Sequence, residues 1–227
     1  MKSAVITFPG SNCDRDMDVA LKKFGFKNKM VWHQDVELPK SDLVVLPGGF
    51  SYGDYLRCGS MASKSKIMQS VINFANSGGM VMGICNGFQI LVETGLVPGV
   101  LLRNKYLEFI CKNVFVKINN KDNAYFRKIS KNVLELHIAH NEGNYFCTND
   151  QLKEIEDNTQ VAINYCDPEG KIGEPFNPNG SINNIAGIFN KEKNVLGMMP
   201  HPERMIDHSL SGEDGSHFFK NLINNLK

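Results

Sequence analysis

Two alternating hydrophobic patterns dominate the first half of the chain. Short apolar runs typical of buried strands alternate with segments in which apolar residues recur every three or four positions, as in an amphipathic helix. The first helical segment begins near Met17 and ends at Gly25. Apolar strands that alternate with helices predict a parallel sheet covered by helices on both faces. The strand-like runs are 3–8, 29–32, 42–46 and 80–84, and two further helical segments are 67–75 and 89–94.

The second half contains more strand-like than helical sequence. Segment 166–184 is crowded with Gly, Pro, Asn and Asp, which predicts turns or a long hairpin loop. Apolar residues from Phe218 to Leu226 predict a closing amphipathic helix. No repeat, low-complexity tract or Ser/Gly linker divides the chain. We therefore expect one domain, residues 1–227, with an α/β fold: a mostly parallel sheet flanked by helices, and additional antiparallel strands in the second half. The later strand-like runs are 114–118, 133–139, 160–165, 184–189 and 195–199.

Composition and charge exclude several classes of partner. The 227 residues include 25 Lys and Arg against 24 Asp and Glu, a net charge of +1. No clustered basic excess is present for binding nucleic acid or an anionic membrane. The apolar stretch before Pro9 is too short for a secretion signal or a membrane span. None of the six cysteines forms the Cys-x-x-Cys spacing of a redox motif or zinc knuckle. We expect a cytoplasmic protein with reduced thiols.

One cysteine occupies a position suited to nucleophilic chemistry. Cys85 lies in the segment GICNG, residues 83–87, directly after an apolar run and at the start of a helical segment. A nucleophile between two glycines, on a sharp turn from strand to helix, is exposed at the top of the sheet. The helix N-terminus also favours the reactive thiolate. The alternative is that Cys85 is a small buried apolar residue, as most free cysteines are.

A histidine and a carboxylate follow another predicted strand. His201 and Glu203 lie in MMPHPER, residues 198–204, on either side of Pro202, whose fixed φ stiffens the turn. A cysteine nucleophile needs an imidazole to accept and return its proton, and a carboxylate orients that imidazole. The alternative is a surface histidine beside Glu203 or Arg204 by accident.

A pair of glycines marks a third strand end. The segment LPGGFSYGD, residues 46–54, contains Gly48 and Gly49 immediately after an apolar run. Consecutive glycines allow a backbone N–H to point into a site, and acyl transfer needs such donors for its oxyanion. The alternative is an ordinary glycine-rich turn.

Taken together, these motifs resemble the class I glutamine amidotransferases. Within that class, the chain is most similar to the glutaminase subunits of phosphoribosylformylglycinamidine synthases, and the resemblance extends over nearly the whole chain. It implies the fold of that class. The segments GICNGFQ and HPE are shared across the class, whereas PGSNCDRD and GGFSYGDYLRCG indicate this member. The matching segments are 8–16, 47–59, 83–91, 177–181 and 199–204.

The resemblance implies a role for each matching site residue. Cys85 is the implied nucleophile, His201 the acid and base, and Glu203 the residue that orients His201. The backbone N–H groups of Gly49 and Asn86 are the implied oxyanion hole. The implied substrate-binding residues are Gly48, Gln89, His140, Asn141, Glu142 and Gly143.

The segment AHNEGNY, residues 139–145, departs from the family pattern at one position. Asn141 stands where the family has glycine. Because asparagine tolerates a left-handed backbone better than most residues, we expect the loop to keep its conformation. Ser60 and Met61 also depart from the small apolar pair expected after the RCG sequence, and we expect no consequence.

The resemblance also implies the reaction and the partners. Glutamine is hydrolysed to glutamate and ammonia. The ammonia passes to a large synthetase subunit, which uses ATP and Mg²⁺ to convert formylglycinamide ribonucleotide to formylglycinamidine ribonucleotide in purine biosynthesis. A small accessory subunit completes the complex, and this chain itself carries no cofactor or metal. Its sequence has neither a P-loop nor a Gly-x-Gly-x-x-Gly fingerprint. Residues 51–59 and 166–184 are candidate docking surfaces, or simply solvated loops.

Three other functions are open at this stage. The chain could be another amidotransferase of the class, serving GMP, CTP or anthranilate synthesis, although PGSNCDRD and GGFSYGDYLRCG argue against this. It could be a stand-alone hydrolase, such as a γ-glutamyl peptidase, or a catalytically silent binding subunit. A zinc site at Cys85 and His201 has little support, because Glu203 follows the histidine too closely. We interpret Cys13 and Cys58 as small buried or loop residues, and His137 as a packing residue.

Overall fold

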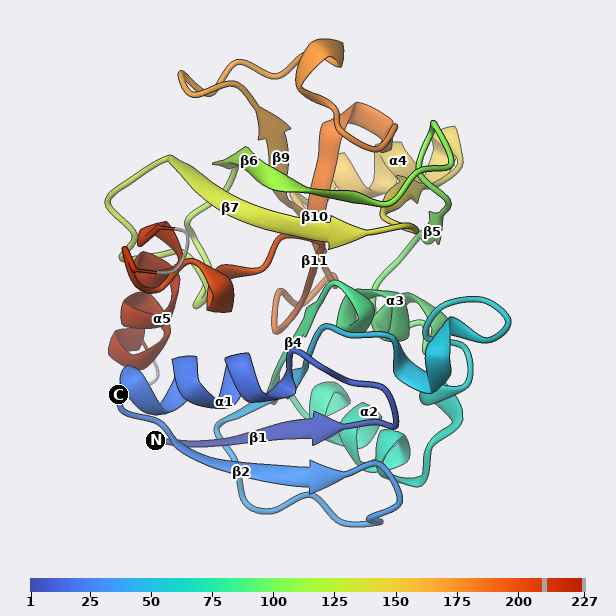
Figure 1. Cartoon of the computed structure of the whole chain (residues 1–227), viewed down its shortest axis with the longest axis vertical. Coiled ribbons are helices and arrows are strands. Elements are labelled where there is room, and N and C mark those ends of the chain that lie inside the picture. The colour runs from blue at the N-terminus through green and yellow to red at the C-terminus, as the bar shows by residue number, and fades with distance from the viewer. Residues whose placement is uncertain (210–211, 226–227) are drawn as a thin grey trace.

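A nine-stranded sheet forms the centre of the protein in the computed structural model, which describes residues 1–209 and 212–225 (Figure 1). Five neighbouring strands are parallel: β2 (Lys27–Trp32), β1 (Lys2–Thr7), β3 (Leu43–Leu46), β4 (Met80–Ile84) and β11 (Val195–Met198). The sheet continues through four antiparallel pairings to β10 (Ile185–Phe189), β9 (Val161–Cys166), β6 (Ile110–Ile118) and β7 (Val133–His140). The expected α/β fold, with antiparallel strands in the second half, is confirmed.

Helices cover this sheet in two groups. The first group comprises α1 (Asp14–Lys23), which packs on β1 and β2, and α5 (Asp214–Asn225), which packs on β7. The second comprises α2 (Lys66–Asn76) and α3 (Asn86–Glu93), which both contact β4. Helix α3 begins at Asn86, three residues before the start predicted from the apolar pattern. The closing helix predicted up to Leu226 is present as α5, and Leu226 itself lies outside the described residues.

The central strands are buried on both faces. Every residue of β3, β4, β10 and β11 is buried, whereas in the edge strand β2 only Val31 is. Strands covered on both faces appear in sequence as unbroken apolar runs, which is why they could be predicted. Because β3, β4 and β11 are parallel, their carboxyl ends meet at one edge of the sheet, and the three motifs that follow these strands converge there.

Three elements are absent from the sequence-based prediction. Strands β5 (Val100–Leu102) and β8 (Asn144–Phe146) form a separate two-stranded sheet, and helix α4 (Asn149–Asp157) follows β8. Segment 166–184 joins the antiparallel strands β9 and β10, as a hairpin loop does, and contains two short 3₁₀ turns. Among residues 1–209 and 212–225, no helix is long and apolar enough to cross a membrane.

Candidate active site

Cys85 occupies a strained turn between β4 and α3. Its backbone has φ 50° and ψ −105°, a conformation that residues with a side chain seldom adopt. The two flanking glycines are required by close packing. A Cβ on Gly87 would lie 1.9 Å from the carbonyl oxygen of Leu46, and one on Gly83 would lie 2.6 Å from that of Gly87. The Cys85 side chain is buried, with Sγ 3.6 Å from the carbonyl oxygen of Ala139. The sharp strand-to-helix turn is as predicted, whereas the thiol is buried and not exposed at the top of the sheet.

His201 and Glu203 form a buried pair beyond the end of β11. Nδ1 of His201 lies 2.6 Å from Oε1 of Glu203, and both side chains are at most 2% exposed. Because a carboxylate only accepts hydrogen bonds, Nδ1 carries the proton in this contact. Nε2 of His201 has no hydrogen-bond partner among the described residues. The backbone N–H of His201 donates to the carbonyl oxygen of His137 at 2.8 Å, so β7 holds the loop in place.

Electrostatics favour the protonated form of His201. Burial is the largest single influence and lowers the pKa of its imidazole, but the Glu203 carboxylate, Cys85 and Cys13 together outweigh it. The pKa of His201 is consequently well above its ordinary value. An imidazolium beside a cysteine is the arrangement that stabilises a thiolate.

Gly48 and Gly49 bring the backbone after β3 close to this pair. A Cβ on Gly48 would lie 2.6 Å from Cε1 of His201. Gly49 has φ 147°, and a Cβ there would lie 2.8 Å from both the Cα of Ser11 and the N of Asn12. The glycines are therefore needed for close approach, which an ordinary turn would not require.

A cavity of about 250 Å³ joins these residues. Cys85, His201 and Gly49 line it together with Asn12, Cys13, Phe50, Phe109, Cys111, Ala139 and Arg204. The structure thus brings a thiol, a buried His–Glu pair and a glycine backbone to one small cavity. These are the components that acyl transfer from a small substrate requires.

Side chains in the first half of α3 form hydrogen bonds with neighbouring loops. Asn86 Oδ1 accepts a hydrogen bond from the backbone N–H of Ser51 at 3.2 Å. Asn86 Nδ2 donates to Gln89 Oε1 at 2.8 Å, and Gln89 Nε2 donates to the carbonyl oxygen of Glu142 at 2.7 Å. The structure therefore places Asn86, Gln89 and the 140–143 segment together, and their predicted roles stay predictions.

The backbone at Asn141 differs from the expectation. Asn141 does not have a positive φ, so the position makes no left-handed demand that asparagine would need to tolerate. Its carbonyl oxygen accepts a hydrogen bond from the backbone N–H of Asn104 at 2.9 Å. Any residue with an ordinary backbone conformation suits this position, which explains why asparagine can stand there.

His140, one residue earlier, is buried and uncharged. Burial, reinforced by the nearby positive charge of His201, lowers the pKa of its imidazole to about 3. Its side chain is only 2% exposed. His140 is therefore neutral at physiological pH.

Comparison with known proteins agrees with this geometry. Residues 1–214 match the family model of the CobB/CobQ-like glutamine amidotransferase domain. A phosphoribosylformylglycinamidine synthase subunit PurQ from Pelagibacter ubique is 81% identical over 227 residues, which cover all of both chains. The chain belongs to the PurQ family of glutamine amidotransferases. A second PurQ, from Rhodopseudomonas palustris (strain HaA2), is 50% identical across all of this chain and 99% of its own. A chain of the solved structure of PurLQS from Thermotoga maritima superposes with a TM-score of 0.88 at 39% identity, covering 100% and 99% of the two chains.

Among the residues of this PurQ-family site that were not predicted from the sequence, Cys13 and Arg204 contact each other. Cys13 Sγ accepts a hydrogen bond from Arg204 Nη2 at 3.1 Å, and both residues line the cavity. Cys13 is buried, as interpreted from the sequence, but its side chain also lines the cavity. The signal available was its position just beyond the first strand, at the same sheet edge as the other motifs.

Ligand atoms of Cys13, His201 and Glu203 lie within 4.8 Å of one another, a spacing that could hold a metal ion. The Arg204 guanidinium and the protonated His201 disfavour a cation there.

Proposed function

We propose that this chain is the glutaminase subunit of a phosphoribosylformylglycinamidine synthase. The observation that carries the proposal is the meeting of Cys85, the His201–Glu203 pair and Gly49 at one cavity, in a chain 81% identical to a PurQ subunit. We take the whole chain, residues 1–227, as one glutaminase domain, because a continuous nine-stranded sheet contains strands from both halves of the chain.

In the proposed reaction, the Cys85 thiolate attacks the side-chain carbonyl carbon of glutamine. The backbone N–H groups of Gly49 and Asn86 stabilise the resulting oxyanion. His201 donates its proton to the departing nitrogen as the C–N bond breaks, which releases ammonia and leaves a γ-glutamyl thioester. Water, activated by the now neutral His201, hydrolyses the thioester and regenerates the thiolate. Glu203 holds the tautomer of His201 and stabilises its cation.

Ammonia released into bulk water at neutral pH would be protonated and lose its nucleophilicity. We therefore propose that the chain works in a complex with a large synthetase subunit, which binds ATP, Mg²⁺ and formylglycinamide ribonucleotide. A small accessory subunit is proposed to complete the complex. The PurLQS structure of the Thermotoga relative supports such an assembly. All six cysteines are free, which fits a reducing compartment, and we place the complex in the cytoplasm.

Reconstitution with a large synthetase subunit tests the proposal. We expect glutamine-dependent amination of formylglycinamide ribonucleotide, loss of this activity in Cys85→Ser, and unchanged activity of that variant with ammonia as nitrogen donor. Cys147→Ser is the matched control, because Cys147 is buried but does not line the cavity. Glutamine-dependent activity in Cys85→Ser, or failure of ammonia to support the variant, would contradict the proposal.

A further inference from the structure

The peptide groups on either side of Gly143 are each held by a buried asparagine. The N–H of Gly143 donates to Asn104 Oδ1 at 3.1 Å, and its carbonyl oxygen accepts from Asn179 Nδ2 at 2.8 Å. The two asparagine side chains are 1% and 0% exposed. A Cβ on Gly143 would lie 2.4 Å from Cε1 of His140, so the backbone is pressed against that imidazole. Ser181 Oγ also lies 3.2 Å from the Gly143 carbonyl oxygen, so the backbone around residue 143 is held on both sides.

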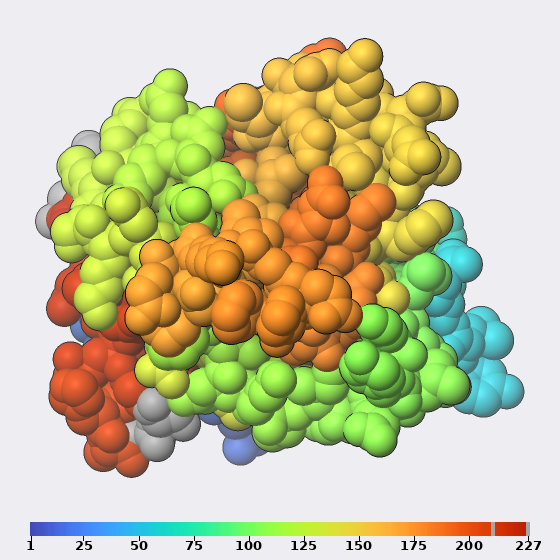
Figure 2. All heavy atoms as spheres, turned by 90° about the horizontal axis from the view of Figure 1, so that it is seen from above, coloured from blue at the N-terminus to red at the C-terminus, as the bar shows by residue number. Residues whose placement is uncertain are grey.

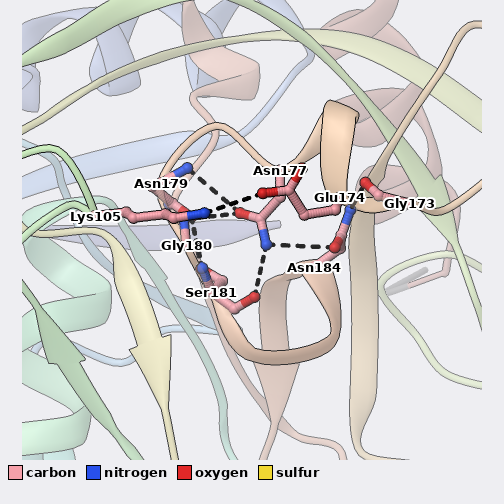
Figure 3. Close-up of polar contacts among 8 residues, drawn as sticks. All are labelled: Lys105, Gly173, Glu174, Asn177, Asn179, Gly180, Ser181 and Asn184. Atoms are coloured by element: carbon pink, nitrogen blue, oxygen red, sulfur yellow. Dashed lines mark hydrogen bonds and ion pairs between the residues drawn. The ribbon is translucent and has the colours of Figure 1, made fainter.

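Asn179 belongs to the turn 177–181, sequence NPNGS, whose contacts fix its amide (Figure 3). Asn177 Oδ1 accepts from the N–H groups of Asn179 and Gly180, at 3.4 and 2.8 Å. Asn179 Oδ1 in turn accepts from the backbone N–H and the hydroxyl of Ser181, at 3.1 and 2.7 Å. With its oxygen occupied in this way, the Asn179 side chain presents its NH₂ group to Gly143.

Asn104 fixes the protonation of His140 in the same manner. Asn104 Nδ2 donates to the carbonyl oxygens of Glu108 and His140, at 2.8 and 2.9 Å, so its Oδ1 faces Gly143 and His140. Nδ1 of His140 lies 3.1 Å from that oxygen and must carry the ring proton. Nε2 of His140 is then an acceptor, and it is buried without a hydrogen-bond partner among the described residues.

Backbone hydrogen bonds join the same segments. The N–H of Lys105 donates to the carbonyl oxygen of Asn179 at 2.9 Å, next to the bond from Asn104 to Asn141. Lys105 and Glu174 form an ion pair of 3.0 Å (Figure 3), but both side chains are at least half exposed, and such pairs contribute little to stability. In the space-filling view, the orange spheres of the 166–184 loop lie against green spheres of an earlier part of the chain (Figure 2). The buried side chains of Asn104 and Asn179, and not the exposed Lys105–Glu174 pair, hold these segments of the chain together.

We propose that Asn104 and Asn179 are positioning residues for the glutamine site. They fix the backbone around Gly143 and the tautomer of His140. His140 is the last residue of β7, the strand that also contributes Ala139 to the cavity wall. The inference rests on the proposed function, and it gives the NPNGS turn a role in substrate binding. The backbone carbonyl of Glu142, which lies between His140 and Gly143, accepts a hydrogen bond from Gln89 on α3. Displacement of the 140–143 segment would therefore alter the pocket while leaving Cys85 and His201 in place.

The reconstituted complex tests this through the kinetics of Asn179 variants. Asn179→Ala removes the amide. Asn179→Asp keeps the shape and the acceptor for Ser181 but turns a carboxylate oxygen toward the Gly143 carbonyl. We expect each variant to raise the KM for glutamine at least tenfold with less than a threefold change in kcat, and Asn179→Asp to be the more severe. Ammonia-dependent amination should not change. If Asn179→Ala fails to fold, the isosteric Asn179→Asp decides.

Asn221→Ala is the matched control. Asn221 is 2% exposed and donates to the backbone carbonyls of Ala124 and Tyr125 beneath α5, outside this network. We expect lower thermal stability and an unchanged KM for glutamine. An active wild-type complex with unchanged KM in both Asn179 variants, or an equal KM increase in Asn221→Ala, would overturn the positioning role alone. A wild-type complex without glutamine-dependent activity would overturn the proposed function itself.

Discussion

Nδ1 of His201 and Oε1 of Glu203 lie 2.6 Å apart, buried, with only Pro202 between the two residues along the chain. Glu203 is the main group that raises the pKa of His201 against the opposing effect of burial. Replacing Glu203 with Gln removes that charge and lowers the pKa of His201. We expect turnover to fall by about 10²–10⁴-fold, the range typical of a lost acid–base function. The alkaline limb of the pH–rate profile, where His201 loses its proton, should move to lower pH.

The profile is measured as glutaminase activity of the complex between pH 5 and 10. Glu213→Gln provides the control, because Glu213 pairs at the surface with His208. An alkaline limb that stays at the wild-type position in Glu203→Gln would show that another group carries the proton.

Gly48 is predicted to be essential because of its closeness to His201. An added Cβ would lie 2.6 Å from Cε1 of His201 and 3.2 Å from Sγ of Cys13. Since Glu203 and burial fix the imidazole, Gly48→Ala must displace it. A displacement of about 1 Å in a catalytic group can cost about 10²-fold in rate. We expect a loss of at least tenfold in glutamine-dependent turnover, measured beside a thermal unfolding curve.

Gly173→Ala is the corresponding control. A Cβ at Gly173 meets nothing nearer than 3.7 Å, and its φ of −177° suits any residue. Its activity and stability should equal those of the wild type. Full activity in Gly48→Ala would mean that the glycine pair does not constrain the site.

Asp214 is predicted to stabilise the fold in a pH-dependent way. Its carboxylate accepts from Lys131 Nζ at 2.5 Å and from the backbone N–H of Glu135 at 2.9 Å, which ties α5 to β7. Burial raises the pKa of Asp214, but these two contacts outweigh it and lower the pKa overall. The resulting stabilisation is present above the ordinary pKa of the carboxyl group and is lost as pH falls through the lowered value.

Asp214→Asn should therefore destabilise the protein by about 1.5–3 kcal/mol at pH 7, the range for hydrogen bonds to charged groups. The difference from wild type should narrow as pH falls from 5 toward 3. Urea unfolding at several pH values measures both free energies. A difference that stays constant across this range would contradict the role of the charge.

Much of the fold was predictable because the parallel strands are buried on both faces. Runs such as 43–46 and 80–84 are apolar throughout, and no polar residue interrupts the pattern. Helix α4 was missed because only Ile155 within it is buried, so it has almost no apolar face. Its capping box, formed by Thr148 and Gln151, was the available signal. Strands β5 and β8 have three residues each, too few for a periodic pattern.

The candidate site was predictable where a motif follows a strand. Cys85 comes directly after β4, and His201 and Gly49 are each the third residue after a strand. Parallel strands bring such positions to one edge of the sheet. The hydrogen bonds that hold the backbone around Gly143 could not be predicted this way. Asn104 and Asn179 contact Gly143 across more than thirty residues of sequence, and no local spacing encodes those hydrogen bonds. The contact of Cys13 with Arg204 spans 191 residues.

The six thiols differ in environment, so they should differ in reactivity toward an electrophile. Burial, with Asp54 and Glu142 nearby, raises the pKa of Cys58 far above its ordinary value. Burial also raises the pKa of Cys147, and that of Cys166 to about 11. These three thiols should stay protonated. Cys111 and Cys13 line the cavity, so they are the informative competitors of Cys85.

The most direct measurement is peptide mapping after reaction with a glutamine-like electrophile, with and without excess glutamine. We expect a covalent adduct on Cys85 alone and no adduct in Cys85→Ser. Excess glutamine should suppress formation of the adduct. Cys13→Ala should still be labelled at Cys85. Equal labelling of Cys13 or Cys58, or an unlabelled Cys85, would contradict the assignment of Cys85 as the nucleophile.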